Sequence, residues 1–119
     1  EDGWVRLVSR IKEIIITGGF NVYPAEVEEA IAEHPDVVDV AAVGRPRQDG
    51  SEDVVGCVTL RDGAVLDPEG LKEFCRERLT RYKVPRTFYH FEDLARDNLG
   101  KIRRHQVRKD LLELLEAKA

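Results

Sequence analysis

The residue best suited to chemistry in this chain is Lys101, which ends the run DNLGK at residues 97–101. A glycine-containing turn delivers its ammonium group, and residues 96–109 carry six Lys or Arg against one acid. Such a lysine is a point charge with three hydrogen-bond donors. It could stabilise a phosphate or a developing oxyanion. A solvated surface lysine is the alternative, and the Gly-Lys pair alone does not exclude it.

A second segment with functional potential is SRIKEIIITGGFNVYP, at residues 9–24. Its Gly18-Gly19 pair separates two extended stretches. Without a Cβ, this backbone could approach a ligand closely. A tight turn is the commoner explanation of two adjacent glycines. The segment matches neither the G-x-x-x-x-G-K-[ST] nor the G-x-G-x-x-G pattern, so it is no phosphate loop of those kinds.

A third feature is a basic run at residues 76–86. It contains Arg76, Arg78, Arg81, Lys83 and Arg86 against one acid, Glu77. The run could bind a polyphosphate such as a nucleotide tail. A solvated helix face is the alternative explanation of such a charge run.

Other catalytic chemistry finds little support. His34, His90 and His105 are widely spaced and lack a metal-ligand pattern, so we expect no metal site. No Ser-His-Asp or Cys-His arrangement can be argued. The acidic residues at 26–29 follow Pro24 and fit the positive end of a helix better than a catalytic carboxylate pair.

Composition narrows the class of protein further. The net charge of −4 argues against broad nucleic-acid binding. Cys57 and Cys75 lie in apolar patterns without C-x-x-C spacing, which predicts buried free thiols and favours the reducing cytoplasm. No apolar run reaches the length of a membrane span. The sequence has neither a signal peptide nor a methionine, so we expect it to be part of a longer protein.

The scaffold that positions these groups can be read from the patterning. The length of 119 residues indicates one domain. Apolar and β-branched patterns predict strands at residues 4–8, 14–16, 20–22, 37–43, 54–60 and 87–91. Helices are expected from Pro24 to His34, from Asp67 to Lys83 and over residues 104–116. The predicted fold class is α+β, a small mixed sheet of about three main strands with a short N-terminal hairpin, flanked by helices.

Four ordered segments resemble one protein family. They are residues 10–28, residues 34–37 (HPDV), residues 82–86 (YKVPR) and residues 100–104 (GKIRR). In order and spacing they are similar to the small C-terminal domain of adenylate-forming enzymes, which include acyl-CoA synthetases, adenylation domains of nonribosomal peptide synthetases and beetle luciferases. The resemblance spans essentially all of residues 1–119. It implies a mobile domain whose large N-terminal partner domain is absent here, so we expect this chain alone to be inactive.

The resemblance also implies roles in a two-step reaction. A carboxylate attacks the α-phosphate of ATP to give an acyl-adenylate, and a thiol then displaces AMP. Between the steps the small domain rotates. Lys101 matches the lysine of the first step, Lys12 matches the hinge, and Arg10 matches an arginine that contacts the nucleotide. Gly18 and Gly19 match the loop that lines the pantetheine tunnel in the second step.

Residues 18–24 and 99–104 look most like those of fatty-acid–CoA ligases, which implies fatty acid, ATP and CoA as substrates. The Mg²⁺ that accompanies ATP would be held mainly by the N-terminal domain. Arg81 and Lys83 are candidates for contacts with the CoA phosphates. Long-chain acids partition into bilayers, so peripheral membrane contact is compatible with this function. The alternatives are an acyl-AMP ligase or peptide synthetase domain with a carrier-protein acceptor, and a stand-alone binding or regulatory module.

Two departures from the family pattern bear on the site. Ser9 precedes Arg10 where the family often has Asp or Gly. The stretch before the lysine is often LPRTx[ST]GK, whereas residues 94–101 read LARDNLGK. Loss of the proline predicts a looser loop.

Overall fold

The computed structural model describes residues 14–118. The strand predicted at residues 4–8 lies outside this range. Within it, the elements in chain order are β1 (Ile15–Thr17), β2 (Phe20–Val22), α2 (Pro24–Ala32), β3 (Val37–Pro46), β4 (Glu52–Leu60), α3 (Pro68–Arg76), the 3-10 helix η1 (Arg81–Lys83), β5 (Thr87–His90) and α4 (Arg104–Lys118). This order confirms the predicted α+β class.

The main sheet has three strands in the order β3-β4-β5. β3 pairs antiparallel with β4, and β5 joins the other side of β4 in parallel, so the sheet is mixed as predicted. The two long strands extend further than their apolar cores, because Gly44 to Pro46 still pair with residues 52–54. β1 and β2 form a separate antiparallel hairpin.

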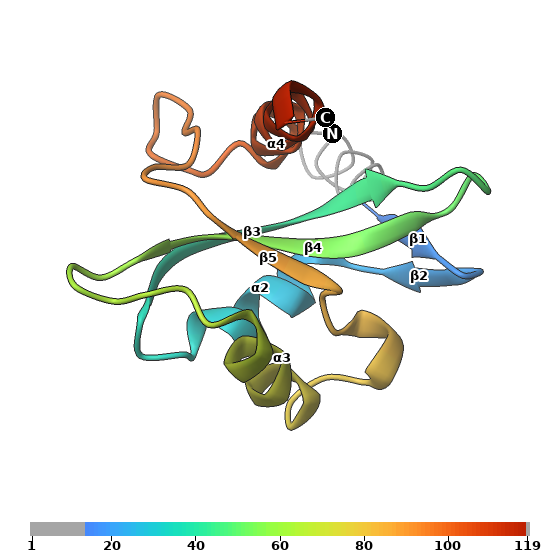
Figure 1. Ribbon diagram of the computed structural model, residues 1–119, viewed down its shortest axis with the longest axis horizontal. Coiled ribbons are helices and arrows are strands. Elements are labelled where there is room, and N and C mark those ends of the chain that lie inside the picture. The colour runs from blue at the N-terminus through green and yellow to red at the C-terminus, as the bar shows by residue number, and fades with distance from the viewer. Residues whose placement is uncertain (1–13, 119) are drawn as a thin grey trace, which may run out of the picture.

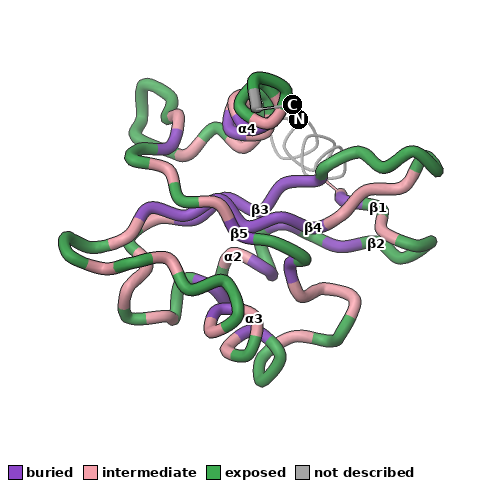
Figure 2. Tube along the Cα trace, viewed as in Figure 1, coloured by how far each residue is buried: buried purple, intermediate pink, exposed green. Residues whose placement is uncertain are grey.

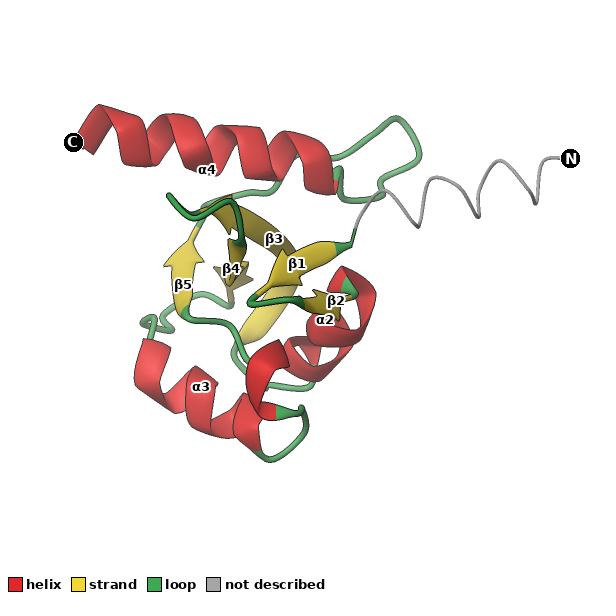
Figure 3. Cartoon of the chain, turned by 90° about the vertical axis from the view of Figure 1, so that its right-hand side faces the viewer, coloured by secondary structure: helices red, strands yellow, loops and turns green. Residues whose placement is uncertain are grey.

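Helices cover both faces of the sheet. Figure 1 shows α4 above the strands and α2 and α3 below them, and Figure 3 shows the same three layers from the side. The alternation along β3 explains this arrangement, because successive side chains point to opposite faces. Val40 and Ala42 pack with α2 and α3, whereas Ala41 and Val43 pack with α4. The purple stretches in Figure 2 show that consecutive residues of the central strands are buried, as expected when both faces of the sheet are covered.

Two helices begin where local signals predict. Pro24 is the first residue of α2, where its missing N–H costs no hydrogen bond. Asp67 caps α3, because its side chain accepts a hydrogen bond from the backbone N–H of Gly70 at 3.1 Å, and Pro68 follows it.

The predicted extent of the second helix is wrong. α3 ends at Arg76, whereas the apolar spacing favoured a helix as far as Lys83. The N–H groups of Arg78 and Leu79 both bond to the carbonyl of Cys75, which closes the helix in a turn. The chain then runs through extended Thr80 into η1. This break brings Leu79 against the core and leads the chain into β5.

No helix among residues 14–118 is both long enough and apolar enough to cross a bilayer.

Candidate functional site

Lys101 lies in the loop between β5 and α4, and this loop is fixed at several points. Leu94 is buried against the α4 side of the sheet, with 2% of its surface exposed. Arg96 and Ile102 form an isolated antiparallel bridge across the base of the turn. The N–H of Arg103 bonds to the carbonyl of Ala95 at 2.8 Å, just before α4 begins. The loop therefore has internal hydrogen bonds, although it lacks the proline of the family pattern.

Asp97 organises the tip of this loop. Its backbone N–H donates to the carbonyl of Lys101 at 2.8 Å, and its carbonyl accepts from Gly100 N–H at 3.0 Å. Its side-chain Oδ1 accepts from the N–H groups of Leu99 and Lys101 at 2.8 and 3.0 Å. The hydrogen bond from the Lys101 backbone is the main reason that the pKa of Asp97 lies below 3.8. Gly100 completes the turn at φ +84°, a conformation that favours glycine.

Arg96 ties the same turn to the sheet. Its Nη1 donates to the carbonyl of Gly100 at 2.8 Å, and its Nη2 pairs with Asp39 of β3. The side chain of Lys101 is exposed. Among residues 14–118 its ammonium group forms no close ion pair, although its charge also helps to lower the pKa of the nearby Asp97 carboxyl. The loop thus presents a cation to solvent on a hydrogen-bonded base.

Gly18 and Gly19 form the turn of the β1–β2 hairpin, as the commoner interpretation of the pair predicts. Their φ angles are +57° and +86°, and a Cβ built at either position would meet no atom within 4 Å. Their lack of side chains is therefore required by backbone conformation and not by packing inside this domain. The turn leaves open space beside it, as a ligand-lining loop needs.

An aromatic pair connects this hairpin to the basic run. Phe20 of β2 stacks on Tyr82 of η1, with ring centroids 4.4 Å apart and 53% of Phe20 exposed. Tyr82 also packs partly against the core. Its exposed partner was not anticipated, because the contact joins segments far apart in the sequence.

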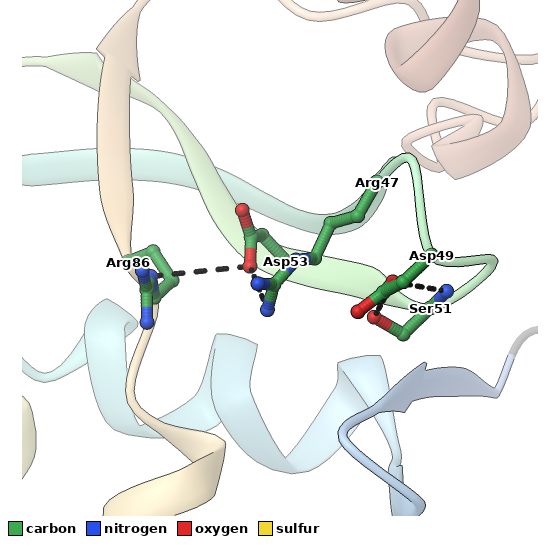
Figure 4. Close-up of polar contacts among 5 residues, drawn as sticks. All are labelled: Arg47, Asp49, Ser51, Asp53 and Arg86. Carbon is green, nitrogen blue, oxygen red and sulfur yellow. Dashed lines mark hydrogen bonds and ion pairs between the residues drawn. The ribbon is translucent and has the colours of Figure 1, made fainter.

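The basic run contributes to an open groove of about 1040 Å³ where β4 and β5 begin. We call it the basic groove; its charged lining residues are Arg45, Asp53, Lys72, Arg76, Arg81 and Arg86. Figure 4 shows Asp53 between Arg47 and Arg86, at 3.4 and 3.9 Å. Nearby, the carboxylate of Asp49 accepts from the N–H and hydroxyl of Ser51, and these bonds lower its pKa. The lining holds five cations against one acid, and two of the cations, Lys72 and Arg76, also pair with Glu69 and Glu73 of α3. The remaining excess of positive charge suits the groove to a polyanion.

The two candidate phosphate contacts differ in their surroundings. Arg81 lines the basic groove. Lys83 instead forms an ion pair with Glu26 of α2 at 2.9 Å, and the hydrogen bond from Lys83 to Glu26 raises the pKa of the lysine. Arg45 and Arg86 join the groove from β3 and from the residue before β5. Sequence reasoning missed Arg45, because only the pairing of β3 with β4 brings it to this side.

A smaller cavity of about 280 Å³ lies between β1, the β3–β4 pair and α4. Its lining includes Arg104 and Arg108. Arg108 donates to the carbonyl of Gly44 at 2.7 Å and to Glu52 at 3.3 Å. Arg104 pairs with Glu28, so both guanidinium groups hold the fold together.

Three further expectations concern the hinge and nucleotide residues, the cysteines and a metal site. Arg10 and Lys12 lie outside the described residues. Cys57 and Cys75 are buried free thiols, as predicted. In the part of the chain that the structure describes, no group of three or more His, Cys, Asp or Glu side chains is arranged to hold a metal ion.

The hairpin turn and the Lys101 loop lie at opposite ends of the domain. In Figure 1 the orange loop before α4 is at the upper left, and the tip of the blue β1–β2 hairpin is at the far right. The longest dimension of the domain is 45 Å. The two segments therefore belong to different sides of the domain.

Comparison with known proteins shows which family the chain resembles in sequence and fold. Residues 26–101 match the family model described as AMP-binding enzyme C-terminal domain. The chain is 42% identical over 119 residues to a long-chain-fatty-acid–CoA ligase of Salmonella typhimurium, all of this chain and 21% of that protein. It thus spans about one fifth of the length of this curated relative.

Solved structures extend the comparison. A Mycobacterium tuberculosis fatty acyl CoA synthetase superposes with a TM-score of 0.78 at 37% identity, over 85% of this chain and 20% of that one. ATP-bound MatB from Rhodopseudomonas palustris superposes with a TM-score of 0.79 at 33% identity, over 87% of this chain and 20% of that one.

Proposed function

Because the chain belongs to the family of AMP-binding enzyme C-terminal domains, we propose that it is the mobile catalytic domain of a long-chain fatty-acid–CoA ligase. The complete enzyme activates a fatty acid with ATP and transfers the acyl group to CoA as a thioester. The domain acts with its own N-terminal domain, which holds most of the ATP, its Mg²⁺ and the acid. On its own it is inactive. The two buried free cysteines support a cytoplasmic location.

Lys101 serves the first step. Its ammonium group bridges the attacking carboxylate and the α-phosphate or ribose oxygens, which lowers the cost of bringing two anions together. Its exposure and the absence of a close ion pair to it among residues 14–118 support this role. A charge already neutralised within the domain would be less available to the substrate.

Gly18 and Gly19 serve the second step. They line the path of the pantetheine arm, where open space beside the turn leaves room for a thin thiol chain. The basic groove takes the phosphates of CoA. Arg81 contributes to it directly, and Lys83 contributes only if it leaves its ion pair with Glu26.

The observation that carries the proposal is the separation of the two segments. The loop before α4, which carries Lys101, and the tip of the β1–β2 hairpin lie on opposite sides of the domain in Figure 1, so we expect one active site to use both by a turn of the domain between the steps. Lys12 is the hinge of that rotation and Arg10 contacts the nucleotide near it, as the family resemblance implies. A hinge of this kind absorbs a backbone change at very few residues.

The test uses the full-length protein with Lys101→Ala and, as a matched control, Lys109→Ala. Lys109 is an exposed lysine of α4. Pyrophosphate release with ATP and a fatty acid reports the first step, and thioester formation from preformed acyl-adenylate and CoA reports the second. Loss of Lys101 should slow the first step by about 10²- to 10³-fold, as for a removed transition-state donor, and leave the second intact.

Two outcomes would contradict the proposal. If both steps survive in Lys101→Ala, the chain is better described as a binding or structural module. If acyl-adenylate forms but reacts with a phosphopantetheinylated carrier protein and not with CoA, the acceptor is wrong.

A further inference from the structure

We propose that Asp97 and Arg96 are positioning residues for Lys101, fixing its backbone so that its ammonium group reaches the same point in each catalytic cycle. The inference rests on the proposed function, in which Lys101 acts in adenylation. Neither residue need touch the substrate. Both act through the loop that carries the lysine.

Asp97 holds Lys101 from both sides of its backbone. Its N–H donates to the Lys101 carbonyl at 2.8 Å, and its Oδ1 accepts the Lys101 N–H at 3.0 Å. The same oxygen accepts the N–H of Leu99 at 2.8 Å. One carboxylate thus closes the turn and fixes the point from which the lysine side chain extends. The residue stands where the family pattern often has Thr, so here the charged side chain supplies the acceptor.

Arg96 sets the turn relative to the sheet. Its guanidinium group joins the carbonyl of Gly100 to the carboxylate of Asp39 in β3. The N–H of Asp39 in turn bonds to the hydroxyl of Thr59 in β4 at 3.0 Å. The loop tip is therefore connected through two polar side chains to the central strands.

This precision matters because a lysine side chain is long and flexible. Four methylene groups separate its charge from the backbone, so any displacement of the loop also displaces the ammonium group. A misplacement of about 1 Å can cost about 10²-fold in rate. Asp97 itself is exposed, so its removal leaves no polar group stranded in the core. Its loss should therefore affect catalysis much more than stability.

The experiment uses the full-length enzyme with Asp97→Ala, Asp97→Asn, Arg96→Ala and Lys101→Ala. Glu92→Ala, an exposed carboxylate earlier in the same loop, is the matched control. Both half-reactions and the melting temperature are measured for each. Asp97→Ala and Arg96→Ala should slow adenylation by about 10- to 100-fold and leave thioester formation and the melting temperature unchanged. Asp97→Asn keeps the acceptor oxygen and should restore adenylation.

The possible failures are distinct. If Lys101→Ala abolishes adenylation while Asp97→Ala does not change it, the positioning role is wrong. The same holds if Asp97→Ala slows both half-reactions in step with a lower melting temperature, or if Asp97→Asn rescues nothing. If Lys101→Ala itself leaves adenylation intact, the proposed function fails and this inference fails with it.

Discussion

Glu28 in α2 and Arg104 at the start of α4 form a bidentate ion pair between residues 76 positions apart in the sequence, with both N–O distances 2.7 Å. The same carboxylate accepts the N–H of Ala42 in β3 at 2.8 Å. Since α2 and α4 cover opposite faces of the sheet, Glu28 joins both layers at the free edge of β3. The pair also fixes the start of the helix that follows Lys101.

Replacing Glu28 should weaken the fold. Glu28→Gln can still accept the Ala42 N–H, but it removes the charge that pairs with Arg104. With 17% and 23% of the two side chains exposed, we expect the free energy of unfolding to fall by about 1–3 kcal/mol. Chemical denaturation of the 119-residue chain measures this. The control is Glu29→Gln, at an exposed position in the same helix, and equal effects of the two changes would contradict the assignment.

The Gly18-Gly19 turn should tolerate alanine in the fold but not in the second step. Gly19→Ala meets no atom within 4 Å, and strain at φ +86° should cost about 1–2 kcal/mol. In the full-length enzyme, adenylation should persist while thioester formation falls, because a methyl group narrows the path of the thiol.

Gly63→Ala is the matched control for this prediction. Its φ is +84° and its surroundings are also open, but it lies in the β4–α3 connection away from the hairpin. An equal loss of thioester formation in both variants would show that backbone strain, and not the position of the turn, is responsible.

The basic groove should respond specifically to CoA. Arg81→Ala and Arg86→Ala should each raise the KM for CoA by about 10-fold, which corresponds to one charge-assisted hydrogen bond of about 1.5 kcal/mol. The KM values for ATP and fatty acid should stay the same, and the effect should shrink as salt screens the groove. Arg61→Ala, which removes an exposed ion pair with Asp36, is the control. An unchanged KM for CoA in both groove variants would contradict the proposal that the basic groove binds the phosphates of CoA.

The two cysteines should be inert in the folded chain. Burial raises the pKa of Cys57 to about 12 and that of Cys75 to about 11. At pH 8 both remain thiols, and the thiolate is the nucleophile. Alkylation followed by mass spectrometry should modify neither residue in native protein and both in denaturant. Rapid modification of either in native protein would contradict this.

The same shifts predict a loss of stability in alkali. In the unfolded chain the thiols ionise near their ordinary pKa of 9.0, whereas in the folded chain they stay protonated to about 11 or 12. The contribution of the two protonated thiols to folding stability is therefore fully present below pH 9. It is lost as the pH rises from 9 through the folded pKa values. In Cys57→Ala, the free energy of unfolding should fall less steeply with rising pH above pH 9 than it does in the wild type.

Much of this domain follows from local patterns in the sequence. Apolar and β-branched runs indicate β3 and β4, Pro24 and Asp67 mark where α2 and α3 begin, and the two glycines mark the hairpin turn. These signals depend on neighbours along the chain, so they can be read without knowing the fold. The Gly-Lys turn and the basic run were visible for the same reason, although neither showed its partners.

Only the tertiary structure decided which of these residues meet. The apolar spacing of residues 71–79 predicts a longer helix, but the path into β5 ends α3 at Arg76. Lys83 and Arg81 look equivalent in the sequence, yet Glu26 pairs with one and leaves the other in the groove. In the sequence, Asp97 is only a departure from the family pattern before the lysine. Its hydrogen bond with the Lys101 backbone is evident only in the structure. These contacts depend on strand pairing and helix docking between distant segments, and local sequence signals carry no information about such pairings.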